Sequence, residues 1–258
     1  MDKRIAIVTG ASSGLGAEFV KQLDEHEKLD EIWVIARRRE RMAALQEEVH
    51  TPLRVFAWDL TEPETFSGFS ELLASEKPHI MFLVNAAGYG KIGSFRDISP
   101  EENERMVDLN RRAAMSVTQR SIPYMGKGSR VLEICSTAAF QPMQYLDTYA
   151  ATKAFLYRYS RALRIELLGT GIHVTAVCPY WIKDTEFIGV AQKTKNSRYI
   201  RHFPLGSKKH SVAAMALCAS RLNLPVATPG IICTLHRIVA KFIPHSLMMG
   251  VWALIRRI

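Results

Sequence analysis

The sequence predicts an α/β fold, in which helices flank a doubly wound parallel β-sheet within a single domain. Short runs rich in β-branched residues alternate along the chain with longer segments of helical periodicity. That alternation is typical of parallel strands joined by crossover helices. The length of 258 residues, without a repeat or a dividing linker, suits one domain with a sizeable core.

Each predicted strand is a short apolar run, and each predicted helix is the longer segment that follows it. Strands are predicted at 4–9 (RIAIVT), 31–36 (EIWVIA), 53–58 (LRVFAW), 79–85 (HIMFLVN), 130–136 (RVLEICS), 172–179 (IHVTAVCP) and 230–235 (GIICTL). Helices are predicted at 14–27, 38–49, 61–75 and 99–122, in the segment that contains Tyr149, and as a C-terminal helical tail over about 235–258. The polar, basic stretch at about 180–210 lacks a clear period, and we expect it to form a substrate loop or lid.

Composition sets limits on the class of protein. Hydrophobic residues make up 48% and charged residues 23%, which argues against disorder and against a fibrous protein. The net charge of +9 can attract phosphates, cofactors, lipid headgroups or nucleic acid, and its sign does not choose among them. A nucleic-acid binder would call for clustered basic residues with interleaved aromatics, and RYSRALR at 158–164 is the one suggestive run, so we expect no nucleic-acid partner.

Cysteine usage and hydropathy favour a cytoplasmic protein. The cysteines at 135, 178, 218 and 233 form no CxxC pair, which indicates reduced, mostly buried thiols, and the eight scattered histidines suggest no metal site. The N-terminal apolar run is too short for a signal peptide. The longest apolar run, at 247–255, is about half of what a spanning helix needs.

The first predicted strand ends in a glycine-rich loop, TGASSGLG, from which a helix begins. Gly10 would allow the turn, Gly14 a close backbone approach, and Gly16 tight packing of the helix. The helix N-terminus would then face a pyrophosphate. An ordinary strand-to-helix loop is the alternative, but the position after the first strand favours a nucleotide site formed by Ser12, Ser13 and Leu15 together with the glycines.

The second predicted strand ends in ARRRE, where an NAD site normally carries an acidic residue. Arg37 or Arg38 could bind a 2′-phosphate through charge-assisted hydrogen bonds, so NADP(H) is preferred to NAD(H). The alternative is that these arginines belong to a solvated helix end.

The third and fourth predicted strands also end in candidate cofactor residues, because ligands bind at strand ends in open α/β sheets. Asp59 could accept a hydrogen bond from an adenine amino group, with Leu60 beside it. Asn85 and Ala86 would lie beside the nucleotide. Taken singly, an Asp or Asn at a strand end is more often a helix cap.

Tyr149 and Lys153 lie four residues apart in DTYAATKA, which places them on one helix face. A nearby ammonium favours phenolate and would lower the pKa of Tyr149. Such a tyrosine can exchange a proton near neutral pH. The alternative is a surface pair without chemistry.

Taken together, TGASSGLG, NAAG and YAATK occur in the order and approximate spacing of the short-chain dehydrogenase/reductase family, which the chain resembles from residue 4 to about 185. The resemblance implies a Rossmann fold, a nicotinamide cofactor and a catalytic set of Asn, Ser, Tyr and Lys. By motif these correspond to Asn110, Ser136, Tyr149 and Lys153. Pro179 and Thr185 correspond to cofactor contacts after the sixth strand, although Tyr180 stands where the family usually has glycine.

The resemblance also implies a role for each residue of this set. Tyr149 would donate a proton to the oxygen of a ketone, which Ser136 would hold by a hydrogen bond. Lys153 would tune the tyrosine and bind the nicotinamide ribose, and the backbone of Asn110 would hold a water that relays protons. The expected function is the NADP(H)-dependent interconversion of a secondary alcohol and a ketone.

The substrate is less constrained by the sequence. Trp181, Phe187 and Phe203 would suit a lipophilic ketone or alcohol such as a steroid or bile acid, in the manner of a hydroxysteroid dehydrogenase. A 3-ketoacyl-thioester reductase and a non-catalytic NADP(H) sensor are the alternatives. The sensor should have lost Tyr149 or Lys153, and both are present.

The C-terminal tail and the assembly state complete the expectations. Met248, Trp252 and Ile255 lie at helical spacing, before Arg256 and Arg257. This helix could rest on a membrane surface. Packing against the protein's own core or a partner subunit is favoured, because apolar helical faces usually serve a core. The family resemblance implies a homodimer or homotetramer.

Overall fold

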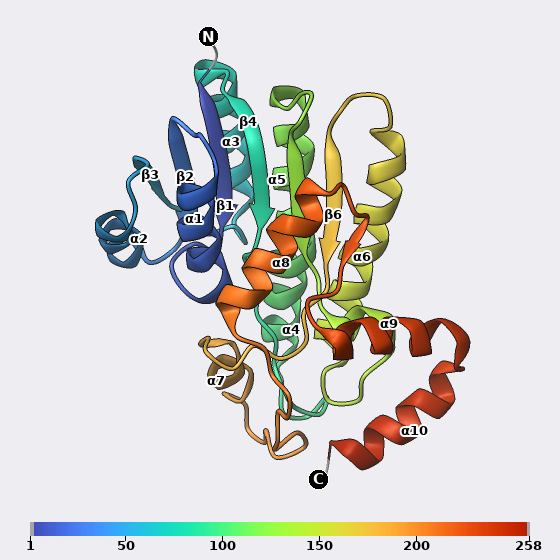
Figure 1. Ribbon diagram of the computed structural model, residues 1–258. Helices are drawn as coiled ribbons and strands as arrows, with labels where there is room; N and C mark the ends of the chain where they lie inside the picture. Colours follow the sequence, from blue (N-terminus) through green and yellow to red (C-terminus); the bar gives the residue numbers. More distant parts are fainter. Residues whose placement is uncertain (1–2, 257–258) are drawn as a thin grey trace.

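The computed structural model describes residues 3–256 (Figure 1). Its strands are β1 (Arg4–Thr9), β2 (Glu31–Ala36), β3 (Leu53–Ala57), β4 (His79–Asn85), β5 (Arg130–Ile134), β6 (His173–Val177) and β7 (Val226–Ala227). Its helices are α1 (Gly14–His26), α2 (Arg39–Leu45), α3 (Pro63–Glu76), α4 (Pro100–Val107), α5 (Ala114–Ser121), α6 (Asp147–Glu166), α7 (Phe187–Ala191), α8 (Lys209–Arg221), α9 (Ile231–Phe242) and α10 (His245–Ile255).

The strands form one seven-stranded sheet in the order β3-β2-β1-β4-β5-β6-β7, and each neighbouring pair of strands is parallel. The order reverses between β1 and β4, which opens a crevice at the carboxyl ends of these strands. The structure therefore confirms the doubly wound parallel sheet and six of the predicted strands.

The seventh predicted strand, 230–235, is wrong. The last strand is the short β7, and the predicted segment is the start of α9, which begins after Gly230 at a φ of 104°. A short apolar run does not by itself distinguish a strand from a helix segment, because a run of a few apolar residues is compatible with either element. The apolar residues in fact continue at helical spacing to Phe242.

Helices cover both faces of the sheet and close two apolar cores. On one face, Phe19 and Leu23 of α1, Met42 of α2 and Ala216 of α8 pack with side chains of β1 and β2. On the other face, the core is filled from α3, α5 and α6 against the alternate strand positions. All four cysteines are free, and three of them are buried.

The predicted helix at 99–122 contains a π-helical stretch, Asp108–Ala113, between α4 and α5. A π-helix widens the turn and displaces side chains from the regular helical period, which periodicity alone does not reveal. Asn110 lies in this stretch and is fully buried.

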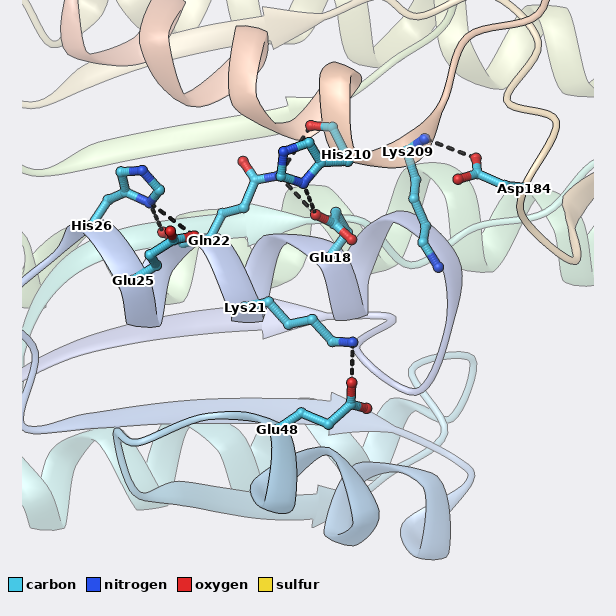
Figure 2. Close-up of polar contacts among 9 residues, drawn as sticks. All are labelled: Glu18, Lys21, Gln22, Glu25, His26, Glu48, Asp184, Lys209 and His210. Atoms are coloured by element: carbon cyan, nitrogen blue, oxygen red, sulfur yellow. Dashed lines mark hydrogen bonds and ion pairs between the residues drawn. The ribbon is translucent and has the colours of Figure 1, made fainter.

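The segment between β6 and α8 is fastened at both ends. Two backbone hydrogen bonds, from Ser207 to Trp181 at 2.8 Å and from Lys183 to Ser207 at 3.1 Å, close its base. Asp184 accepts from the first N–H of α8 at Lys209, at 2.8 Å, as Figure 2 shows.

Helix α8 is in turn bound to α1 by side chains. The Nε2 of Gln22 donates to the carbonyl oxygen of His210 at 3.0 Å, and the His210 ring lies 2.9 Å from the carboxylate of Glu18 (Figure 2). The loop that carries Asp184 is thereby held against the helix that begins in the glycine loop.

Helices α9 and α10 follow the sheet and lie at the end of the molecule where the strands have their carboxyl ends (Figure 1). The inner face of α10 packs on the protein through Met248 and Trp252, so the predicted packing on the chain's own core is found for these two residues, whereas Ile255 is 51% exposed. Among the described residues, no helix combines the length and the apolar character needed to span a membrane.

Candidate active site

A cavity of about 590 Å³ lies at the carboxyl ends of the central strands. It brings together predicted residues that are far apart in the sequence. Those that line it are Gly10, Ser12, Ser13, Gly14, Leu15, Gly16, Arg37, Arg38, Asp59, Leu60, Ala86, Ser136, Tyr149, Lys153, Pro179 and Thr185. Two predicted residues, Asn85 and Asn110, are not among the lining side chains.

The glycine loop forms one end of the cavity, and its geometry requires glycine. Gly10 and Gly14 have positive φ values of 69° and 56°. A Cβ on Gly16 would lie 2.3 Å from the carbonyl oxygen of Gly10, so no side chain fits there. Helix α1 begins after Ser13, which gives it no side-chain cap, and its first N–H groups therefore open toward the cavity.

Arg38 lies next to this loop and makes more hydrogen bonds to protein side chains than Arg37 does. It donates to Ser12 at 3.2 Å, to Ser13 at 2.6 Å and to the carboxylate of Glu186 at 2.8 Å. The Arg37 side chain is 62% exposed and lies 3.8 Å from Asp59.

Asp59 also lines the cavity, and its carboxylate interacts with a threonine and two arginines. Burial alone would raise the pKa of this carboxyl, but hydrogen bonds from Thr61 and the charges of Arg37 and Arg105 leave it below its ordinary value. The Arg105 guanidinium lies 2.8 Å from Asp59, a contact that the sequence did not indicate.

These groups suit a phosphorylated dinucleotide. The uncapped helix N-terminus and the hydroxyls of Ser12 and Ser13 are donors for a pyrophosphate. Arg38 carries the kind of guanidinium that could bind a 2′-phosphate. The donors lie within one cavity, in the strand-loop-helix arrangement that such a cofactor requires.

Tyr149 and Lys153 are both buried on the inner face of α6. The Lys153 Nζ donates to the carbonyl oxygen of Ile134 at 2.7 Å and lies 5.8 Å from the centre of the Tyr149 ring. Burial raises the pKa of Tyr149, and hydrogen bonding to Ser136 opposes that rise. The structure thus differs from the expected lowering of the Tyr149 pKa, because desolvation of the buried phenol is the largest effect on it.

The pKa of Lys153 is shifted downward, whereas that of Tyr149 is shifted upward. Burial lowers its pKa, and the nearby acidic groups, among them Glu133, oppose the shift. Ser136 lies at the end of β5, where its Oγ accepts from the N–H of Ala138 at 3.1 Å and so holds the side chain at the cavity wall.

Asn110 lies behind the cavity wall. Its amide donates to the carbonyl oxygen of Tyr89 at 2.8 Å and to Thr152 at 3.1 Å, and its Oδ1 accepts from the N–H of Tyr89 at 3.0 Å. A Cβ on Gly88 would lie 2.8 Å from this Oδ1 and 3.4 Å from the Nζ of Lys153. The absence of a side chain at Gly88 therefore lets Asn110 and Lys153 both lie close to this part of the backbone.

The side chain of Asn85 does not line the cavity in which we expect the nucleotide. Successive side chains of a strand point to opposite faces of the sheet. The side chain of Asn85 points to the face that α5 covers. There its amide donates to Thr118 at 2.7 Å and to Glu133 at 3.0 Å. Burial raises the pKa of Glu133 to about 7, against the hydrogen bonds from Thr118 and Asn85.

The segment that follows β6 covers the cavity with apolar side chains. The ring of Phe187 lies 5.4 Å from that of Tyr149, and a Cβ on Gly90 would lie about 3 Å from both rings. The carbonyl oxygen of Ala191 accepts a hydrogen bond from the N–H of Ile92 at 2.8 Å. This bond joins the covering segment to the loop after β4. Trp181 lines the cavity, and Phe203 packs behind it at 4.6 Å between ring centres.

Several residues of the cavity were not predicted from the sequence. Met143 and Leu146, in the turn before α6, line it on the side of Tyr149. This turn contains no recognisable motif, and from the sequence alone its apolar residues could equally have packed in the hydrophobic core. Glu186 and Gly90 likewise gave no signal, since their roles depend on contacts between distant segments.

Comparison with known proteins places the chain in a family. Residues 4–196 match the model of the short chain dehydrogenases. An uncharacterized oxidoreductase of Staphylococcus epidermidis is 29% identical over 69% of this chain and 77% of its own length. The NADP-dependent 3-hydroxy acid dehydrogenase YdfG of Escherichia coli is 30% identical, over 73% of this chain and 77% of its own.

Solved structures agree with the fold. A short-chain dehydrogenase from Sphingobium yanoikuyae, solved in complex with NADPH, superposes with a TM-score of 0.76 and 25% identity, over 99% of this chain and 96% of its own. The match of the family model over most of the chain and the cavity at the carboxyl ends of the strands lead to the same conclusion: the protein belongs to the short-chain dehydrogenase family of oxidoreductases.

Proposed function

We propose that the protein uses NADP(H) to interconvert a secondary alcohol and a ketone, and that the substrate is lipophilic. One observation carries the proposal: Ser136, Tyr149 and Lys153 line the same cavity as the glycine loop and Arg38. Proton-transfer groups and phosphate-binding groups thus share one enclosed space, as a dinucleotide-dependent reaction on a carbonyl carbon requires.

In the direction of reduction, Tyr149 is the proton donor. Negative charge develops on the ketone oxygen, and a positioned donor neutralises it. Because burial raises the pKa of Tyr149, the phenol is protonated at neutral pH and ready to donate. NADPH, when bound, supplies the hydride that reaches the carbonyl carbon.

The other residues position the substrate for this proton transfer and stabilise the phenolate that forms on Tyr149. Ser136 holds the substrate oxygen within reach of the phenol, consistent with its own hydrogen bonding to Tyr149. The Lys153 ammonium stabilises the phenolate that remains after transfer. Asn110 fixes the 88–90 backbone and Thr152, and so holds α6 against the cavity wall.

NADP(H) is favoured over NAD(H) because of Arg38. Its guanidinium lies at the end of β2 beside the glycine loop, and an acidic residue, which would repel a 2′-phosphate, is absent from ARRR at 36–39. The similarity to an NADPH-bound dehydrogenase and to an NADP-dependent relative supports the same choice.

A lipophilic substrate is proposed from the walls near Tyr149. The side chains there are those of Met143, Leu146, Tyr180, Trp181, Phe187 and Val190. Apolar walls around a few polar groups suit a ligand that is mostly hydrocarbon, such as a steroid or bile acid. Assembly as a homodimer or homotetramer and a cytoplasmic location stay predictions.

A substrate screen tests the proposal. The purified protein is mixed with NADPH and a panel of steroid, bile-acid, acyl and small polar ketones, and the loss of NADPH absorbance is followed. We expect turnover of a lipophilic ketone. Turnover of small polar ketones alone would contradict the lipophilic pocket, and NADPH binding without turnover of any ketone, or of any alcohol with NADP⁺, would indicate a sensor.

A further inference from the structure

The two C-terminal helices expose a long apolar surface, which we call the C-terminal stripe. On α9 and α10 its members are 43–79% exposed. They are Ile231, Leu235, Ile238, Val239, Phe242, Leu247, Val251, Leu254 and Ile255. Exposed apolar patches of this extent are rare on a soluble surface and mark a place where something binds.

Spacing shows that the stripe is a true helical face. On α10, Leu247, Val251 and Leu254 recur at intervals of four and three residues, which keeps them on one side of the helix. Met248 and Trp252 lie on an adjacent side of the helix and are each 8% exposed. Since the inner face already packs on the protein, the outer face is not needed for the core.

The inner face also fixes how α10 is held. The indole N–H of Trp252 donates to the carbonyl oxygen of Gln144 at 3.3 Å. The Arg256 guanidinium donates to the carbonyl oxygen of Tyr199 at 3.2 Å and lies 4.4 Å from the centre of the Tyr145 ring. The helix is therefore docked on the protein by one side, with its apolar side turned outward.

Charge in this part of the chain is one-sided. Residues 187–258 contain no Asp or Glu and 11 Lys or Arg, whereas residues 1–186 contain 25 acidic and 23 basic side chains. The whole positive excess of the protein thus belongs to the segment that ends in the C-terminal stripe. A surface that is both apolar and basic matches an anionic lipid surface.

A basic groove beside the stripe extends the same surface. It has a volume of about 1230 Å³ and lies between α6 and the two C-terminal helices. Its walls include Arg158 and Arg161 from α6 and Arg237 and Lys241 from α9. Among the described residues that line it, Asp147 is the one carboxylate.

A second copy of the chain is the other natural occupant, and charge disfavours it. In a two-fold dimer the same patch would face itself. Arg237 and Lys241 of each copy would then meet basic residues, in a segment (187–258) that contains no Asp or Glu. Like charges facing each other across an interface are unfavourable.

We propose that the C-terminal stripe docks the protein on an anionic membrane surface, with the apolar side chains of α9 and α10 in the headgroup region and the basic residues near lipid phosphates. The catalytic cavity then lies close to the membrane, because α9 and α10 lie at the carboxyl end of the sheet (Figure 1). This inference does not depend on the proposed reaction.

Sedimentation of the full chain with vesicles tests the proposal. Vesicles of phosphatidylcholine alone are compared with vesicles that also contain phosphatidylglycerol, over a range of lipid concentrations. We expect binding to the anionic vesicles to be at least about tenfold tighter, and to weaken in high salt, since both apolar and electrostatic terms contribute.

Matched variants separate the stripe from general hydrophobicity. Leu247→Ser with Leu254→Ser changes side chains that are 63% and 66% exposed, and we expect it to weaken vesicle binding at least about tenfold. The control, Leu168→Ser with Leu222→Ser, changes side chains that are 67% and 66% exposed after α6 and α8, at the opposite end of the sheet, and should bind as wild type does. Lys241→Glu should also weaken binding to the anionic vesicles.

Three results would overturn the proposal. Wild-type protein could stay in the supernatant with the anionic vesicles. The Leu247→Ser, Leu254→Ser variant could bind them as tightly as wild type. Finally, sedimentation velocity could show a wild-type oligomer that this variant dissociates, in which case a second copy, and not a membrane, covers the stripe.

Discussion

The carboxylate of Glu186 accepts a hydrogen bond from the guanidinium of Arg38, with 2.8 Å between Oε2 and Nη1, and its other oxygen pairs with Arg41. Hydrogen bonds from Arg41 and Arg38 hold the pKa of Glu186 at about 2, so it is charged throughout the neutral range. The pair joins the cover of the cavity to the end of β2. A 2′-phosphate that binds Arg38 must therefore share that arginine with a carboxylate of the protein.

Glu186→Gln should tighten NADPH binding. Removing the carboxylate charge frees Arg38 for the 2′-phosphate and relieves repulsion between two anions. The side chains of Arg38 and Glu186 are 41% and 47% exposed, so the gain is small, about threefold in Kd. NADH, which lacks the phosphate, should bind equally well to both proteins.

Fluorescence titration with NADPH and NADH measures this effect. Glu71→Gln, which removes an exposed carboxyl on α3, controls for the change in net charge. Weaker NADPH binding by Glu186→Gln would show that the carboxylate closes the cover over the cofactor and does not compete with it.

Arg38→Leu should cost much more NADPH affinity than Arg37→Leu. A charge-assisted hydrogen bond to phosphate contributes about 1.5–3 kcal/mol, so the Kd for NADPH should rise roughly tenfold to a hundredfold. Arg37 is more exposed and lies near Asp59, and its loss should change the Kd by no more than about threefold. The same titrations measure both variants, and equal losses of NADH affinity would contradict a role in binding the 2′-phosphate.

Gly16→Ala should destabilise the protein and weaken binding of the cofactor. The new methyl group would lie 2.3 Å from the carbonyl oxygen of Gly10 and force the glycine loop apart, at a cost of about 1–3 kcal/mol. Gly68→Ala is the matched control, since nothing lies within 4 Å of the new Cβ in α3, and it should stabilise by up to about 1 kcal/mol. Urea unfolding of both variants measures the difference, and equal midpoints would contradict the tight turn.

Glu133→Gln should be most stabilising at alkaline pH. The pKa of Glu133 is about 7 in the folded protein and about 4.3 in an unfolded chain. Between these values the folded state holds a proton that the unfolded state has lost, so the unfolding free energy of wild type falls as pH rises. Glutamine removes this slope and can still accept from Asn85 and Thr118.

Urea unfolding from pH 4.5 to 8 measures the slope. The stability of Glu133→Gln relative to wild type should increase across this range, by on the order of a few kcal/mol, and level off above the folded-state pKa. Glu166→Gln, on the exposed side of α6, controls for the loss of a carboxyl. The same pH dependence in both variants would contradict the assignment.

The sequence predicted the sheet well because its strands are buried on both faces. Such strands are nearly continuous apolar runs, as in β1 and β2, and each is followed by a helix of clear period. The prediction failed at 230–235, where the apolar run is the exposed face of α9. The two-residue β7 is too short to give any pattern.

The residues of the candidate site likewise fall into those that the sequence predicted and those that it did not. Residues that lie in local motifs, such as Gly16, Ser136 and Tyr149, were predicted because the motif spans only a few positions. Glu186 and Gly88 act through contacts with segments far away in the sequence, and no local pattern reveals them. Asn85 belonged to a motif, yet its side chain turns into the sheet, since the motif does not specify which face of the strand a residue occupies.

The role of Tyr149 is the central claim, and Tyr149→Phe tests it most directly. The variant keeps the ring that packs on Phe187 and loses only the proton donor. We predict that it binds NADPH as wild type does, while turnover of the responding ketone falls roughly a hundredfold to ten-thousandfold. Turnover at the wild-type rate by Tyr149→Phe would contradict the account.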